Sequence, residues 1–517
     1  MNGNQNLRRN ALPLALGAAM GLAVAAPQAA EITVAVASGF TTLDPYDASD
    51  TLSRTVSSSF YEGLFSLDDQ NRPVPALATG YEVSDDGLVY TMKLREGVKF
   101  QDGTDFDANA VKINFDRLLD KANNLSRRGF LSMIDKVEVV DPMTVRFTLQ
   151  MPFSAFVSRL ATGTAVMICP KAIEQYGGDV AFKPCGTGPY IMKDYNPSER
   201  LYVVKNPNYW QKGLPKLDGI LWKPVVENST RAAMLRTGEA QFAYTIPAEQ
   251  VKTLQGVKGI EVLVEPSIIS RYLIIINNQK KPFTDPRVRA AINYAINKEA
   301  LVKVAFAGYA EPMTGVIPKE ISGFENLGVW PYDPKKAREL LAEAGFPNGF
   351  ETELWSGYNN TTAAKVIQFI QQQLRQVGIK TNLRTLEAGQ RVAMIESVRT
   401  VEEAQSRLYY IGWSNSTAEP DWCLRPIFDS RNAPPVLANE GYYVNKKVDE
   451  LFDKALLETD LAKREENYRE IQRLIWQDAG FAPLVTEMNI SGRSLKLKNF
   501  RVLPSGSYDF YQAELEP

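Results

Sequence analysis

The segment from Thr79 to Leu119 constrains the fold more than any other stretch of this chain. Apolar and polar residues alternate on both sides of Asp85-Asp86-Gly87, which supply turn chemistry, so the pattern predicts a β-hairpin. A polar loop with Gly103 follows, and a helix with an apolar face is expected to open near Asp107. The segment therefore predicts a hairpin, a loop and a helix in that order.

The remainder of the chain also alternates between strand and helix patterns. A strand is expected over 32–37 and a hairpin over 137–149, whereas the second half is more helical. Asp-Pro pairs are expected to open two helices, over 285–295 and 333–345. Further helices are expected at 366–377, 448–457 and 461–477, and further strands at 379–383 and 481–486. A chain of 517 residues exceeds one ordinary core, so two or more lobes are expected.

Histidine is absent from the whole sequence. This absence excludes a Ser-His-Asp or Cys-His arrangement and any zinc, nickel or haem held by imidazole. Lys plus Arg at 58 against Asp plus Glu at 60 gives a formal net charge of -2, without a basic block that would suit nucleic acid. We therefore expect a binding protein rather than an enzyme, with no catalytic residue, cofactor or metal.

The N-terminal residues have the pattern of a secretory signal peptide. Arg8 and Arg9 precede an apolar run over 11–26, and Ala29-Ala30 provide a cleavage site. A membrane anchor is the weaker interpretation, because a bilayer span needs roughly 20 apolar residues. We expect a signal peptide over residues 1–29 and a mature protein in the periplasm.

In such an oxidising compartment, two of the three cysteines are candidates for a disulfide. Cys169 and Cys185 are separated by a short helical pattern and a glycine-rich return that can bring them together. A disulfide and two buried thiols remain equal alternatives, because spacing alone does not give the Cα separation that a disulfide requires. Cys423, next to Trp422, is expected to be a packed thiol.

The hairpin, loop and helix resemble the peptide-binding family of solute-binding proteins that serve ABC importers. Four other segments share this resemblance: Phe40 to Pro45, Gly186 to Tyr190, Pro282 to Arg289 and Tyr332 to Pro334. Within the family, the glutathione-binding members are similar over FTTLDPYDASDTLS, VKFQDGTDF, TRAAMLRTGEAQFA, LVKVAFAGYA, WPYDPKKARELL and EAGQR. The resemblance covers essentially the whole mature chain.

This resemblance implies an α/β architecture of the two-lobed periplasmic-binding-protein type II fold, with an additional inserted β-rich subdomain. The chain is expected to cross between lobes near Lys281 to Asp285 and Val485 to Ile490, and the lobes to close around a ligand. Its implied domains are 30–74, 190–284 and 488–517 for lobe 1, 75–189 for the inserted subdomain, and 285–487 for lobe 2.

The resemblance also implies a function. The protein would capture glutathione between its lobes as a monomer and deliver it to the permease subunits of an ABC importer in the inner membrane. Two alternatives stay open: a di- or oligopeptide-binding protein of a peptide importer, and a periplasmic hydrolase or chaperone.

Glutathione carries two carboxylates and one ammonium, so its cleft needs cationic donors at two places and an acidic acceptor at one. Arginine suits a carboxylate because its planar fork binds both oxygens. Arg391, in the EAGQR segment, is the candidate for this role, with Arg54 and Arg271 as alternatives. Each is only a candidate, because an arginine is far more often a solvated surface charge than a ligand contact.

The segment from Gly412 to Trp422 bears on specificity. Peptide-binding relatives place an aspartate for the peptide's ammonium three residues before the acidic-Pro pair, and this chain has Ser416 there. A hydroxyl is no counter-charge for an ammonium, so Glu419 or Asp421 is expected to replace it, unless these two only shape an exposed turn. Further candidates for lining the cleft are Thr41, Thr42, Tyr61 and Trp413.

Overall fold

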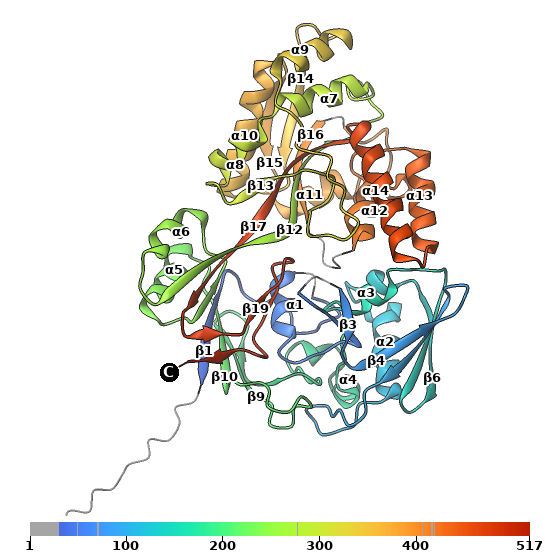
Figure 1. Cartoon of the computed structure of the whole chain (residues 1–517), viewed down its shortest axis with the longest axis vertical. Helices are drawn as coiled ribbons and strands as arrows, with labels where there is room; N and C mark the ends of the chain where they lie inside the picture. Colours follow the sequence, from blue (N-terminus) through green and yellow to red (C-terminus); the bar gives the residue numbers. More distant parts are fainter. Residues whose placement is uncertain are drawn as a thin grey trace, which may run out of the picture.

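The computed structural model describes residues 30–48, 50–69, 72–276, 278–405, 407–414, 417 and 419–516. The expected signal peptide, residues 1–29, lies outside them. The chain forms two lobes, one above the other in Figure 1, with two long strands passing between them. Among the helices within the described ranges, none combines the length and apolar composition that crossing a membrane requires.

One mixed sheet extends through both lobes in the order β15-β14-β16-β12-β17-β11-β1-β10-β9-β8. Its strands are β1 (Glu31–Val36), β8 (Tyr190–Asn196), β9 (Arg200–Lys205), β10 (Gly219–Pro224), β11 (Phe242–Tyr244), β12 (Ile260–Ile276), β14 (Glu351–Ser356), β15 (Lys380–Thr385), β16 (Arg407–Ser414) and β17 (Phe481–Ser494). The short strand β13 (Ala310–Pro312) pairs with β17 outside this order.

Strands β12 and β17 are the long antiparallel pair at the centre of this sheet. Their register runs from Ile260 opposite Ser494 to Ile274 opposite Phe481. One end of the pair joins β11 in lobe 1, and the other joins β16 in lobe 2, so these strands connect the lobes. The expected crossing over 485–490 lies within β17, whereas 281–285 follows the end of β12. The domain boundaries given above stay a prediction.

Lobe 1 carries the β-rich part in a separate four-stranded sheet, ordered β4-β5-β7-β6. Its elements are β4 (Ala78–Val83), β5 (Val89–Leu94), β6 (Ile134–Asp141), β7 (Thr144–Leu149) and α2 (Ala108–Leu119). Asp107 caps α2 by accepting a hydrogen bond from the backbone N of Ala110 at 2.8 Å. Phe115 of α2 packs edge-on against Phe147 of β7, with ring centroids 4.9 Å apart. The predicted hairpin, loop and helix are confirmed.

Lobe 1 has further helices and strands beside the four-stranded sheet and its part of the large sheet. The helices are α1 (Thr51–Ser57), α3 (Phe156–Leu160), α4 (Pro170–Tyr176), α5 (Asn228–Thr237) and α6 (Ala248–Gln255). The remaining strands are β2 (Phe65–Leu67), β3 (Pro73–Pro75), β18 (Leu497–Lys498), β19 (Arg501–Val502), β20 (Tyr508–Asp509) and β21 (Glu514–Leu515). The C-terminal strands therefore return to lobe 1, beside α1 and β1 (Figure 1).

Lobe 2 has helices on its part of the sheet and a helical cluster beside them (Figure 1). Its helices are α7 (Pro286–Ala295), α8 (Lys298–Ala305), α9 (Pro334–Glu343), α10 (Thr361–Gln376), α11 (Ala388–Arg391), α12 (Pro420–Phe428), α13 (Lys446–Leu457) and α14 (Leu461–Gln477). Asp285 and Asp333 cap α7 and α9, each followed by proline at the first helical position, as the sequence predicted.

The two lobes also touch through side chains outside the long strands. Ser158 of α3 donates a hydrogen bond to Glu419 at 2.5 Å, and Glu419 pairs with Arg464 of α14 at 2.9 Å. Arg464 also donates to the backbone O of Ser154 at 3.0 Å. These contacts hold the end of the β-rich part of lobe 1 against the helical cluster of lobe 2.

A disulfide joins Cys169, next to the start of α4, to Cys185. It is one of the two alternatives that the spacing left open. The bridge spans 16 residues of sequence, and for a loop of this length the chain-entropy model gives a stabilisation of about 3 kcal/mol.

We expect the Cys169→Ala/Cys185→Ala variant to lose about 3 kcal/mol of unfolding free energy. The loss arises because the unfolded chain regains the freedom that the cross-link removes. Urea unfolding of the variant and of the wild type, each with and without reductant, measures it. Reductant should destabilise the wild type alone; equal stability of oxidised wild type and variant would contradict the prediction.

Candidate functional site

Two cavities lie at the end of β16, between the lobes, and another adjoins one of them within lobe 1. The first and second, of about 370 and 200 Å³, lie on lobe 1 and share Ser58, Ser66, Arg501 and Asp509 in their walls. The third, of about 410 Å³, lies on lobe 2. Ser414 lines the second cavity and the preceding residue, Trp413, lines the third, so these two cavities flank the same strand end.

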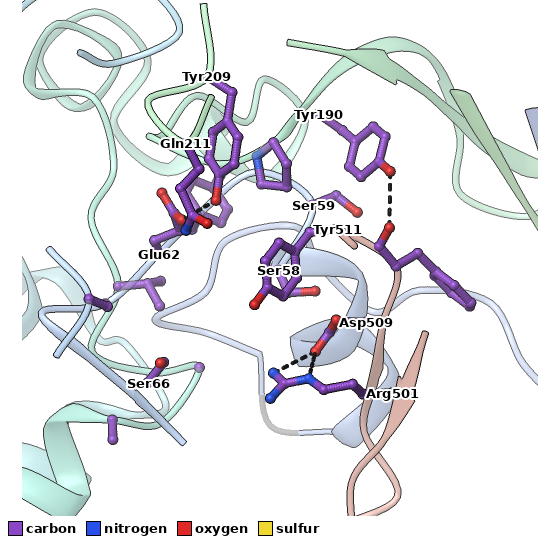
Figure 2. Close-up of a pocket in the computed structure, with 18 of the residues that line it drawn as sticks. Ser58, Ser59, Glu62, Ser66, Tyr190, Tyr209, Gln211, Arg501, Asp509 and Tyr511 are labelled. Atoms are coloured by element: carbon purple, nitrogen blue, oxygen red, sulfur yellow. Dashed lines mark hydrogen bonds and ion pairs between the residues drawn. The ribbon is translucent and has the colours of Figure 1, made fainter. Parts of the chain in front are cut away.

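The first cavity, drawn in Figure 2, contains a carboxylate whose hydrogen bonds are all internal. Glu62 accepts from the hydroxyl of Tyr209 at 2.6 Å, from Nε1 of Trp210 at 2.8 Å and from the hydroxyl of Thr187 at 2.8 Å. Burial raises the pKa of Glu62, and these hydrogen bonds act in the opposite direction. Glu62 therefore fixes the wall of the cavity; Tyr61, an expected contact, also lines it.

The second cavity has an excess of positive charge. Arg54 and Arg127 line it, together with Arg501, which pairs with Asp509 at 2.8 Å. Arg127 donates to the hydroxyl of Thr164 at 3.2 Å and lies 4.6 Å from the ring centroid of Phe130. Within the described residues it has no carboxylate at ion-pair distance, and its buried Nη2 has no hydrogen-bond partner.

This charge excess changes the titration of Arg127. Burial, together with the positive charges of Arg54 and Arg159, lowers its pKa to about 10. A guanidinium that is half-buried and without a counter-charge is a favourable place for a ligand carboxylate. Nothing in the sequence distinguished Arg127 from its neighbour Arg128, because the contacts that define it come from distant loops.

The third cavity combines one cation with two acidic groups. Arg391 pairs through Nε with Glu396 at 2.7 Å, and Glu440 lies in the same wall. Burial and the charge of Glu396, opposed by Arg391, raise the pKa of Glu440 to about 8. Arg391 was predicted to be a ligand contact, and the structure places it in this cavity beside Trp413.

Tyr358 and Gly412 of β16 also line the third cavity. The Tyr358 hydroxyl accepts from Nη1 of Arg271 at 2.8 Å and from the backbone N of Gly412 at 3.1 Å. Arg271, which the sequence offered as an alternative ligand contact, is paired with Glu487 at 2.7 Å. It holds the Tyr358 hydroxyl in place and is not among the residues that line the third cavity. A Cβ at position 412 would lie 2.8 Å from the backbone O of Ser270, as well as 2.0 Å from Nη1 of Arg271, which explains the glycine.

The other expected contacts lie elsewhere. Thr41 donates to Asp50 at 2.5 Å, and Thr42 accepts from the backbone N of Asp44 at 3.0 Å, so both hydroxyls are engaged in local turns. Ser416 lies outside the described residues.

Glu419 and Asp421 belong to the contact between the lobes. Both are buried, and Asp421 pairs with Arg425 at 2.7 Å and accepts from the hydroxyl of Tyr468 at 3.0 Å. Arg159 of α3 stacks on Trp422 at 4.5 Å from the ring centroid, which brings lobe 1 onto the same helix. The structure thus engages both carboxylates in ion pairs rather than in an exposed turn.

The family model for bacterial extracellular solute-binding proteins, family 5, matches residues 72–435. The chain belongs to this family. This family 5 solute-binding protein is 52% identical over 504 residues to a relative named glutathione-binding protein GsiB, from Escherichia coli K12. The alignment covers 97% of this chain and 98% of the relative.

Solved structures show the same architecture. DppA of Helicobacter pylori, in complex with the peptide STSA, is 29% identical with a TM-score of 0.78, covering 94% of this solute-binding protein and 98% of DppA. A dipeptide-binding protein from Pseudoalteromonas sp. SM9913, in complex with Met-Leu, is 25% identical with a TM-score of 0.77, covering 94% and 100%. The predicted two-lobed fold is therefore confirmed.

We expect Glu440 to give this solute-binding protein a pH-dependent stability. A folded-state pKa raised to about 8 means that the protonated carboxyl stabilises the fold below pH 4.5, and this contribution is lost as the pH rises through 8. Glu440→Gln removes the ionisation. Without ligand, the variant should match the wild type near pH 4.5 and exceed its unfolding free energy by a few kcal/mol at pH 9. Urea unfolding at both pH values tests this; a constant difference would contradict it.

Proposed function

We propose that this protein captures glutathione between its two lobes in the periplasm and delivers it to the permease subunits of an ABC importer. The observation that carries the proposal is the 52% identity to a glutathione-binding protein, because it extends over 97% of this chain rather than over one motif. A monomer that binds its ligand without altering it suffices for this function.

The charges of the two facing cavities fit the ligand. The second cavity offers Arg54 and Arg127 for one carboxylate, and the third offers Arg391 for another. Acidic groups lie next to Arg391, where an ammonium needs them. Of the expected contacts, Arg391 and Trp413 line the third cavity and Tyr61 lines the adjoining first cavity, and we retain all three as proposed ligand contacts.

Peptide capture is the second candidate, since two proteins of similar structure are solved with bound peptides. The loss of an aspartate at Ser416 weighs against it, because an α-peptide's ammonium would lack that counter-charge.

Calorimetric titration of the ligand-stripped protein separates these candidates. Glutathione, glutathione disulfide, a dipeptide and a tripeptide are the four ligands, and the recovered ligand is analysed by mass spectrometry. We expect saturable binding of one glutathione per chain, weaker binding of the ordinary peptides and unchanged ligand. Binding of the peptides alone would favour the second candidate, and cleaved glutathione would indicate a hydrolase.

A further inference from the structure

The third cavity contains a buried acid without a partner. Glu440 is 7% exposed, and within the described residues its carboxyl makes neither a hydrogen bond nor an ion pair. A buried carboxylate in this condition costs free energy unless something else satisfies it. Because Glu440 lines an open cavity of about 410 Å³, a ligand can supply the missing donor.

The charged groups around Glu440 come from several elements. Arg391 ends α11, Glu396 ends the short π-helix that follows it (Val392–Glu396), and Tyr409 belongs to β16. A small neighbouring cavity brings Arg407 and Tyr442 to the other side of Glu440. Since Arg391 already pairs with Glu396 through Nε, the third cavity has one more acid than it has cations.

We infer that the third cavity binds the zwitterionic α-amino-acid end of a γ-glutamyl ligand, with Arg391 contacting the α-carboxylate and Glu440, beside Glu396, contacting the α-ammonium. This inference rests on the proposed function and names the end of glutathione that lobe 2 recognises. Recognition of the α-ammonium then requires neither Ser416 nor the ion-paired Glu419 and Asp421.

The compact arrangement of the charges selects a γ-glutamyl group over an ordinary peptide. In a γ-glutamyl group the ammonium and a carboxylate share one carbon, whereas an α-peptide has them at opposite ends. Arg391, Glu396 and Glu440 meet in one cavity, so they suit charges that are close together. Ile274, Ile411 and Ile427 in the same wall offer apolar contact for the methylene groups of the glutamyl stem.

Proton release is a consequence of this arrangement. The pKa of Glu440 is raised to about 8 without ligand, so at pH 7 the carboxyl is mostly protonated. A bound ammonium favours the ionised form, so binding at pH 7 should release about one proton. Calorimetry in buffers of different ionisation enthalpy measures this number.

The test compares glutathione with glutaryl-cysteinyl-glycine, which lacks only the α-amino group. Both ligands are titrated into the wild type, into Glu440→Gln and into a matched surface control, Glu450→Gln on α13. We expect the wild type and the control to prefer glutathione by at least about tenfold. In Glu440→Gln, glutathione should weaken by about that factor, while the desamino ligand keeps its affinity and shows that the variant is folded.

Other outcomes have defined meanings. Equal weakening of both ligands by Glu440→Gln, or a wild type that binds both equally, would overturn the inference while leaving glutathione capture intact. A wild type that binds neither ligand would instead refute the proposed function. Proton release that persists in Glu440→Gln would also contradict the assignment of the ammonium to Glu440.

Discussion

Replacing Arg127 with glutamine should weaken glutathione binding by more than about thirtyfold, which corresponds to about 2 kcal/mol. Arg127 is a half-buried cation in the second cavity that lacks an ion-pair partner within the described chain, so a ligand carboxylate is its natural counter-charge. Its pKa, lowered by burial and by Arg54, shows that its charge is unfavourable without ligand. The unliganded variant should therefore be at least as stable as the wild type.

Arg128→Gln is the matched control, because it removes the same charge from the adjacent residue, which does not line the second cavity. Calorimetry with glutathione and thermal unfolding without it are measured for both variants. The prediction requires that Arg127→Gln binds glutathione weakly and that Arg128→Gln binds it as the wild type does. Equal affinities for the two variants, or a binding loss explained by unfolding, would remove Arg127 from the site.

The Arg464→Met variant should lose about 3–5 kcal/mol of unfolding free energy. Arg464 and Glu419 are buried side chains, 6% and 8% exposed, joined by bonds of 2.9 and 3.1 Å. Removing Arg464 leaves the Glu419 carboxylate buried without its ion-pair partner, which is the costly way to disrupt such a pair. Because Ser158 and Ser154 of lobe 1 bond to this pair, the contact between the lobes should weaken as well.

The double variant Arg464→Met/Glu419→Gln is the control for this second prediction. With the carboxylate gone, no unpaired charge stays buried, so the double variant should recover much of the lost stability. Guanidinium unfolding of the wild type, both single variants and the double variant gives the coupling energy. A double variant as unstable as the sum of the singles would show that packing, rather than charge, dominates here.

Local chemistry predicted much of the fold. Asp107, Asp285 and Asp333 marked helix starts because a capping carboxylate and an Asp-Pro pair act within one turn. Asp85-Asp86-Gly87 located the hairpin because a tight turn needs a residue with positive φ, and Gly87 takes a φ of +70°. The α/β class and the two lobes followed from alternation, chain length and family resemblance.

The site was less predictable, because distant residues define it. Arg127 is exceptional only through Arg54, Thr164 and the cavity they share, and the sequence offers no signal for such neighbours. Glu440 resembles any loop glutamate until folding buries it beside Glu396. Glu419 and Asp421 have the composition of an exposed turn, yet the start of α12 directs both into the contact between lobes.

The central claim is that glutathione lies between the lobes, across the end of β16, with its charges divided between the second and third cavities. A crystal structure of the glutathione complex tests this most directly. We predict one ligand per chain, with one carboxylate at Arg127, the other at Arg391 and the ammonium at Glu440. Glutathione in the first cavity alone, or on the outer surface of either lobe, would contradict the account.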